Sequence, residues 1–163
     1  MIINVPFSLI HLDYLEVQDD QAHIKEFLQE DWYRDLLLTG GGRTVIHDGT
    51  IVGCGGVFPM TDYMGRAWAI LSRYAGPAML PTARIIRDFL HGSDYGRIDT
   101  PVRRDFVNGH RLCRVIGFEN ETKATGMRKY GFNGETYDLY ALFPKEHTHG
   151  KPQPLQETKS PKT

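Results

Sequence analysis

The chain has 163 residues, of which 40% are hydrophobic and 24% are charged, and its formal net charge is −1 at pH 7. This length suits one domain with a sizeable core and is short for two. The near-neutral balance argues against binding through a general basic field, so nucleic acid is not expected as a partner.

The two cysteines, Cys54 and Cys113, predict a reducing environment. A chain of this size does not need a disulfide to stay folded, so we expect two free thiols in a cytosolic setting. No stretch approaches the roughly 20 apolar residues that span a bilayer, and residues 1–12 lack the basic start of a signal peptide. The sequence therefore predicts no membrane span and a protein that is made and used in a cytoplasm, or packaged there.

The first 40 residues suggest a strand followed by a helix. Residues 2–9 are apolar and favour a strand, although Pro6 interrupts them. Asp19 and Asp20 stand ahead of apolar residues spaced i, i+3, i+4, and acidic side chains stabilise a helix start. The pattern predicts one helix that ends before the glycines at 40–42.

A hairpin is the strongest local pattern in the sequence. Residues 44–47 and 51–58 are β-branched runs joined by Asp48-Gly49, a dipeptide that suits a tight turn because both central residues need positive φ. Residues 67–72 predict a third, largely buried strand.

The second half continues with a helix after Pro81, a strand at 98–102 and a helix at 106–116. Gly117 follows that helix in the position that a capping glycine prefers. We expect two closing strands at 122–130 and 137–143. The order predicts an α/β or α+β domain with a mixed sheet covered on both faces.

The segment from residue 144 to 163 is rich in proline and polar residues. It cannot bury enough apolar surface to offset its ordering entropy, so we expect a disordered tail. The predicted domain therefore covers residues 1–143.

The helix and turn at 111–119 resemble the end of the GNAT (GCN5-related N-acetyltransferase) fold. In that superfamily an amphipathic helix closes on a Gly-Phe pair and leads into the last hairpin, as Gly117-Phe118 does here. The order of the preceding strands and helices also matches that of the superfamily, over almost the whole chain. The resemblance implies a central, mostly antiparallel twisted sheet flanked by helices. It also implies direct transfer of an acetyl group from acetyl-coenzyme A (acetyl-CoA), the co-substrate, to a small-molecule or protein amine.

The resemblance also implies a site for the acetyl-CoA pyrophosphate on a glycine-rich turn before a helix, where backbone N–H groups and the helix dipole favour anions. The family pattern is Gln or Arg, two residues, Gly, one residue, then Gly or Ala. Arg73, Gly76 and Ala78 fit this spacing. Pro77 and Pro81 each remove an N–H donor, so an ordinary strand-to-helix connection is the alternative.

The remaining cofactor contacts also follow from the resemblance. Backbone groups of Leu71 and Ser72 are expected to pair with the pantetheine amides. The family often has an asparagine near the start of the last helix. That position aligns with Phe106 here, and Asn108 lies two residues further on.

Catalytic candidates are less clear. Many family members protonate the departing thiolate with a tyrosine four residues before the glycine, and Cys113 stands there. A thiol could donate that proton, and core packing is the alternative role. Asp62 and Asp99, near strand ends, are candidates for the base that takes the amine proton. The histidine spacing places no two on one helix face, so no metal site is expected.

A narrower resemblance concerns GNAT-like proteins of tailed bacteriophages, which are related to a small internal virion protein. It rests on Phe7, His11-Leu12, Leu15, Gln18, Trp68 and residues 99–118. It implies an alternative function, in which a catalytically inactive GNAT fold acts in virion assembly or binds host proteins. Phage or host proteins would then be the partners. An open slot between the central strands would favour the transferase, and a slot filled by side chains would favour the alternative.

Overall fold

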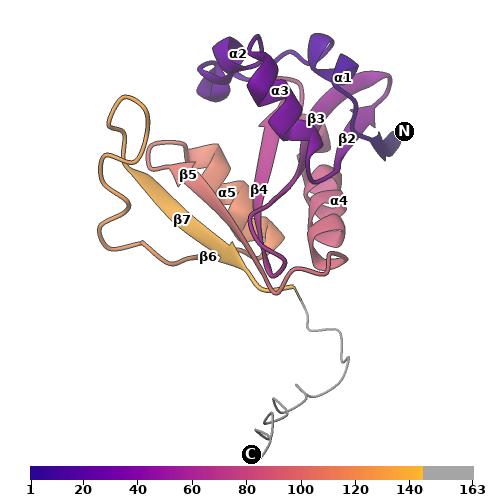
Figure 1. Cartoon of the computed structure of the whole chain (residues 1–163). Coiled ribbons are helices and arrows are strands. Elements are labelled where there is room, and N and C mark those ends of the chain that lie inside the picture. The colour runs from indigo at the N-terminus through magenta and orange to yellow at the C-terminus, as the bar shows by residue number, and fades with distance from the viewer. Residues whose placement is uncertain (145–163) are drawn as a thin grey trace, which may run out of the picture.

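The structure is a computed structural model that describes residues 1–144. In it the protein forms one sheet of seven strands flanked by helices (Figure 1). The strands are β1 (Ile2–Pro6), β2 (Gly42–His47), β3 (Thr50–Pro59), β4 (Met64–Leu71), β5 (Arg97–Arg103), β6 (Glu119–Asn120) and β7 (Tyr137–Leu142). The α-helices are α1 (Ile10–Asp13), α2 (Ile24–Phe27), α3 (Asp31–Leu38), α4 (Met79–His91) and α5 (Val107–Ile116). Two 3-10 turns are η1 (Asp19–Gln21) and η2 (Gly76–Ala78). The tail predicted from residue 145 onward lies outside the described residues.

The strand order is β1-β2-β3-β4-β5-β7-β6, and the β4/β5 pair is parallel whereas the other pairs are antiparallel. This confirms the predicted mixed and mostly antiparallel sheet. The predicted hairpin is confirmed as well, since β2 and β3 pair across a turn in which Asp48 and Gly49 have φ of 47° and 81°.

The two central strands, β4 and β5, pair with each other only over their first residues. β4 and β5 pair only at Met64 with Arg97, Gly65 with Ile98 and Arg66 with Asp99. β4 then runs on to Leu71 and β5 to Arg103 without pairing with each other, and Figure 1 shows the two strands diverging. The sheet is therefore split along the C-terminal halves of its middle strands.

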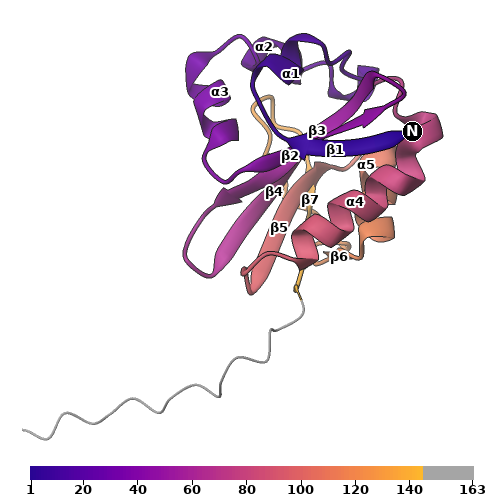
Figure 2. The ribbon, with the colours of Figure 1, turned by 90° about the vertical axis from the view of Figure 1, so that its right-hand side faces the viewer.

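Helices cover both faces of the sheet (Figure 2). α4 and α5 lie on one face, where Leu90 and Ile116 pack with Val57 and Ile98 of the sheet. α1, α2 and α3 lie on the other face, where their apolar side chains pack with Cys54 and Ile70. No helix within residues 1–144 is long and apolar enough to cross a membrane.

The prediction of a strand at 122–130 is wrong. β6 is confined to Glu119–Asn120, and the chain then passes through turns until β7 begins at Tyr137. Gly126, Lys129 and Gly134 have positive φ, which a strand does not accommodate. Their turns outweigh the strand preference of the neighbouring residues.

The single helix predicted after Asp20 is also wrong, because the segment forms η1, α2 and α3 in succession. Glu30 has extended backbone, with φ −88° and ψ 124°, and separates α2 from α3. The break lets Leu28 and Leu37 both reach the core, where they are 6% and 0% exposed. A continuous helix would not bring both side chains to the core, so tertiary packing determines where the helix breaks.

Candidate functional site

An open groove lies at the C-terminal end of β4, between η2, the start of α4 and α5. It has a volume of about 430 Å³. Five of the residues predicted to bind the cofactor line this outer groove, namely Leu71, Ser72, Arg73, Gly76 and Asn108. The structure thus gathers residues from β4, the turn that follows it and α5 around one space.

The turn at residues 73–78 presents its open side to the outer groove. A Cβ atom built on Gly76 would meet nothing within 4 Å. The N–H groups of Tyr74, Ala75 and Ala78 are already used inside the turn, by Ser72 Oγ, the Ser72 carbonyl and the Ala75 carbonyl. Ala78 is 0% exposed and supports the turn from below.

Two arginines line the outer groove. Arg73 is exposed and its guanidinium lies 3.0 Å from the carboxylate of Asp19. Arg111 lies across the groove on α5, three residues after Asn108 and therefore on the same helix face. Arg111 was not among the predicted site residues, although its spacing from Asn108 was the signal in the sequence that could have found it.

A second cavity, the slot, occupies the split between β4 and β5 and has a volume of about 270 Å³. Residues 67–71 and 100–103 form its two edges, and Leu112 and Cys113 of α5 line it from one face of the sheet. Leu71 and Leu112 also line the outer groove, so the two spaces meet at these side chains.

The free edge of β4 is covered by the segment that precedes α2. Gln21 Nε2 donates to the Ala69 carbonyl and the Leu71 N–H donates to Gln21 Oε1, both at 2.9 Å. The Gln18 N–H donates to the Leu71 carbonyl at 3.0 Å. The Gln21 carboxamide therefore occupies backbone groups that a neighbouring strand would otherwise use.

Solved structures share this architecture. The ribosomal-protein-S18-alanine N-acetyltransferase from Escherichia coli matches with a TM-score of 0.65 at 16% identity, over 94% of this chain and 99% of that one. The protein yncA from Salmonella typhimurium, solved with its cofactor acetyl-CoA, matches with a TM-score of 0.62 at 11% identity, over 93% and 99% of the two chains. An acetyltransferase of the GNAT family from Streptococcus pneumoniae matches with a TM-score of 0.59 at 9% identity, over 88% and 99%.

The fold is that of the GNAT acetyltransferases. No protein-family model and no curated protein matches the sequence. The remaining candidate residues are therefore described by where the GNAT fold of this chain places them.

In this GNAT fold, the backbone groups of Ser72 have different hydrogen-bond partners from those of Leu71. Its N–H donates to the Val52 carbonyl on the β3 side, away from the slot. Its carbonyl and its hydroxyl both accept hydrogen bonds from the turn that follows. The backbone groups that face the slot are instead those of Ala69 and Leu71.

Cys113 lines the slot from α5 and is 7% exposed. Burial raises the pKa of its thiol to about 12, and the nearby Arg114 lowers it only in part. A thiol with this pKa holds its proton more tightly than an ordinary thiol, whose pKa is about 8.5. The geometry of Cys113 suits contact with a ligand, while its pKa disfavours proton donation.

The two predicted carboxylates lie apart. Asp99, 4% exposed, accepts two hydrogen bonds from Arg66 at 2.8 and 3.1 Å, where β4 and β5 still pair. Both of its oxygens are therefore engaged. Asp62 lies in the exposed turn before β4, and the strand that separates it from the outer groove spans roughly 25 Å. The structure does not bring Asp62 to the slot.

His23, from the segment between η1 and α2, lines the slot on the face opposite α5. Its pKa is lowered by burial first and by the positive charge of Arg103 second, while Glu135 acts in the opposite direction. The lowered pKa favours the neutral imidazole, which is the form that can accept a proton. No spacing in the sequence pointed to His23.

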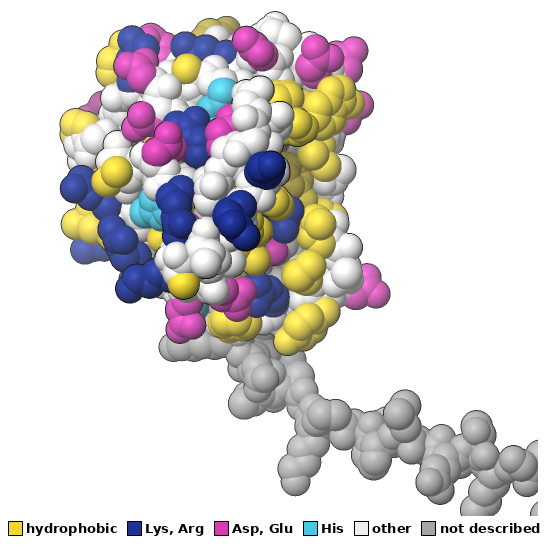
Figure 3. Space-filling view, turned by 90° about the vertical axis from the view of Figure 1, so that its left-hand side faces the viewer, with side chains coloured by type: hydrophobic (Ala, Val, Ile, Leu, Met, Phe, Trp, Pro, Cys, Tyr) yellow, Lys and Arg dark blue, Asp and Glu magenta, His cyan; other side chains and the backbone are white. Residues whose placement is uncertain are grey.

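A cluster of aromatic side chains lies next to the slot, which one of its members, Tyr33, lines. Phe27 of α2 packs 5.4 Å from the Phe132 ring, which belongs to the β6–β7 connection, and Trp32 and Tyr33 complete the cluster. Phe132 is 89% exposed. Figure 3 views the molecule from the left-hand side of Figure 1. Hydrophobic side chains gather along one side of the surface seen there, while Lys and Arg lie mainly elsewhere on it.

Proposed function

We propose that the protein transfers an acyl group from acetyl-CoA or a related thioester to an amine. The observation that carries this proposal is the split between β4 and β5, which joins the outer groove to the slot at Leu71 and Leu112. A long thioester needs such a path, with one arm for its nucleotide end and another for its reacting carbonyl.

The outer groove suits the nucleotide end. Arg73 and Arg111 supply positive charge for a diphosphate, and Gly76 leaves open space at the turn. The relative yncA, described with acetyl-CoA as its cofactor, supports this assignment by fold alone. The prolines at 77 and 81 leave fewer N–H donors, so the arginines carry more of the anion contact.

The edge of β4 suits the pantetheine arm, which contains secondary amides. The Gln21 carboxamide already meets the Ala69 carbonyl with a donor and the Leu71 N–H with an acceptor. The Gln21 carboxamide takes the place of a ligand amide, because both carry an N–H donor and a carbonyl acceptor. Binding would move the Gln21 side chain away and leave the two backbone groups to the ligand.

The chemistry needs only positioning and proton transfer. The amine nitrogen attacks the thioester carbonyl carbon, the C–N bond forms, the C–S bond breaks and the thiolate leaves. Neutral His23 accepts the amine proton from the aromatic side of the slot. Cys113, with a pKa of about 12, forms part of the wall, and the thiolate takes its proton from solvent.

The acceptor is an amine on a small molecule or a protein. The Escherichia coli relative is described as acting on an alanine of ribosomal protein S18, and that description belongs to the relative. The alternative function, an inactive fold used in a virion or on a host protein, rests on sequence resemblance. The slot between β4 and β5 keeps a space of about 270 Å³, and this open space favours the transferase.

Thermal unfolding with and without acetyl-CoA tests the proposal, since a ligand that binds only the folded state raises Tm. We expect a rise of several degrees at millimolar ligand. Gly76→Leu should remove most of this rise and leave the Tm of the free protein nearly unchanged, because the side chain would enter open space. Arg111→Gln should reduce the rise, whereas Arg114→Gln, outside the groove on the same helix, should not. No rise for the wild type at millimolar concentrations of acetyl-CoA and of longer acyl-CoA thioesters would refute the proposal.

A further inference from the structure

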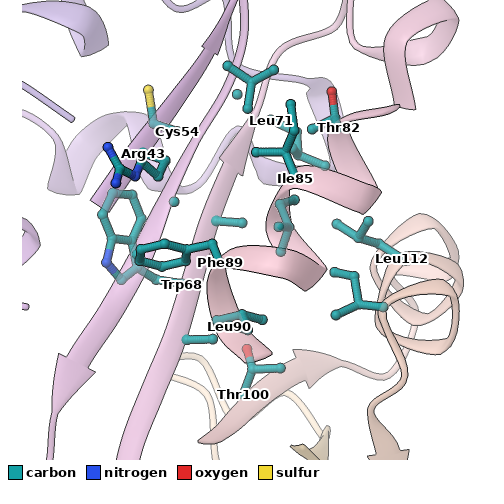
Figure 4. A pocket seen from close by; sticks show the side chains of 18 of the residues that line it. Arg43, Cys54, Trp68, Leu71, Thr82, Ile85, Phe89, Leu90, Thr100 and Leu112 are labelled. Atoms are coloured by element: carbon teal, nitrogen blue, oxygen red, sulfur yellow. The ribbon is translucent and has the colours of Figure 1, made fainter. Parts of the chain in front are cut away.

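A third space, the inner cavity, lies between the sheet and the layer of α4 and α5 and has a volume of about 90 Å³. Figure 4 shows Ile85, Phe89 and Leu90 of α4 and Leu112 of α5 around it. Its walls are almost entirely apolar side chains. Protein interiors rarely leave voids of this size unfilled, so the cavity calls for an explanation.

Small residues on the sheet create the inner cavity. Gly53 and Gly55 of β3 and Ala67 and Ala69 of β4 all line it. Gly55 pairs with Ala69 in the β3–β4 register, and Gly53 and Ala67 flank that pair on the same two strands. Four neighbouring positions thus offer no side chain longer than a methyl group, and α4 does not close the gap.

The inner cavity adjoins the reacting end of the slot. The two spaces share several lining residues, among them Ala67, Trp68, Ala69, Thr100, Leu112 and Cys113, and also Leu71. Leu71 and Leu112 line the outer groove too. A thioester whose nucleotide end lies in the outer groove would therefore bring its acyl group to the mouth of the inner cavity.

The volume sets the length of the acyl group. An apolar cavity of about 150 Å³ holds benzene, which corresponds to roughly 25 Å³ per carbon atom. The inner cavity, at about 90 Å³, thus takes three or four carbons. The single methyl of an acetyl group would leave most of it empty, whereas a butyryl group places three carbons beyond its carbonyl.

We infer that the donor is a short-chain acyl-CoA of the butyryl class, whose alkyl end occupies the inner cavity; this rests on the proposed function. The reaction keeps the same balance as acetyl transfer. The amine forms a C–N bond to the butyryl carbonyl carbon, the C–S bond breaks, the amine loses one proton and the departing thiolate gains one.

Dissociation constants for acetyl-CoA, butyryl-CoA and octanoyl-CoA test the inference with the wild-type protein. Two additional buried methylenes tighten binding by roughly tenfold, so butyryl-CoA should bind about ten times more tightly than acetyl-CoA. Octanoyl-CoA should gain nothing further, because its chain exceeds the cavity. Equal or weaker binding of butyryl-CoA would overturn the inference and leave the proposed function intact. Absence of binding by all three thioesters would overturn both.

A filling variant locates the effect. Ile86→Phe, on the α4 wall, should abolish the preference for butyryl-CoA while acetyl-CoA still binds. Ile51→Phe is the matched control, since Ile51 packs in the cluster with α1 to α3 and lines none of the three spaces. If Ile86→Phe does not fold, Thr100→Leu narrows the mouth from β5 instead. A preference that survives in a folded filling variant would contradict the inference.

Discussion

The Leu71 N–H donates to the side-chain oxygen of Gln21 across 50 residues of sequence, at 2.9 Å. Gln21 is 8% exposed, so this contact lies away from bulk solvent. Its amide nitrogen donates in turn to the Ala69 carbonyl. The edge of β4 is therefore satisfied without a ligand, and a ligand that uses the same groups must displace Gln21.

Gln21→Ala should tighten acetyl-CoA binding by up to about tenfold and reduce stability by roughly 1–2 kcal/mol. The ligand no longer competes with the carboxamide, while the folded protein loses two hydrogen bonds to buried backbone groups. Calorimetric titration and urea unfolding measure the two effects. Gln29→Ala, at an exposed position, is the control and should change neither. Weaker acetyl-CoA binding in Gln21→Ala would mean that Gln21 supports the ligand rather than competing with it.

Local signals account for most of the fold prediction. Asp48-Gly49 specifies the hairpin because both residues adopt positive φ, and Gly117 caps α5 with a φ of 108°. The strand predicted at 122–130 fails for the same reason, because Gly126 and Lys129 adopt positive φ and place turns in that segment. Where a single residue determines the backbone conformation, that part of the fold can be predicted from the local sequence.

The candidate site was less accessible to sequence reasoning. The Arg73 to Ala78 spacing pointed to a turn that lines the outer groove, because that motif is continuous in sequence. Gln21 and His23 come from a segment far from β4 in sequence, and they reach the slot only through tertiary packing. No periodicity marks such residues. Asp99 could be placed at the strand end, but its partner Arg66 becomes visible only once β4 and β5 pair.

His23 should titrate below the ordinary histidine pKa of 6.5, because burial and Arg103 both disfavour the charged ring. Arg103→Gln should raise its pKa by removing a positive charge. Glu135→Gln should lower it further by removing a negative one. Nuclear magnetic resonance of the imidazole protons between pH 4 and 8 follows these changes. A His23 pKa above 6.5 in the wild type would leave the ring largely charged near that pH and would remove the argument for His23 as the base.

Cys113 should make stability fall as the pH rises above about 9. The thiol of the unfolded chain loses its proton near pH 9, whereas the folded protein keeps it until about pH 12. Between these values the unfolded state binds fewer protons, so the free energy of unfolding decreases by about 1.4 kcal/mol per pH unit. Cys113→Ala should show a shallower decline than the wild type in urea unfolding at pH 8 to 10.5. Parallel declines would show that the Cys113 thiol is not protected by burial.

Thr82 and Thr44 should respond in opposite ways to replacement by valine. Both are almost completely buried, at 1% and 0% exposure. The Thr82 hydroxyl has no hydrogen-bond partner among residues 1–144, whereas the Thr44 hydroxyl bonds His11 Nδ1 at 2.8 Å and contacts Cys54 Sγ at 3.4 Å.

Thr82→Val should therefore stabilise the protein by about 1 kcal/mol, because it removes an unpaired polar group that also lines the inner cavity. Thr44→Val should destabilise it by about 1–2 kcal/mol, because the His11 ring loses its hydrogen bond to the hydroxyl and keeps only the one from the Ser8 N–H. Urea unfolding at pH 7 compares the pair under identical conditions. Destabilisation in both variants would show that the Thr82 hydroxyl is hydrogen-bonded in solution, most simply to a water molecule held in the inner cavity.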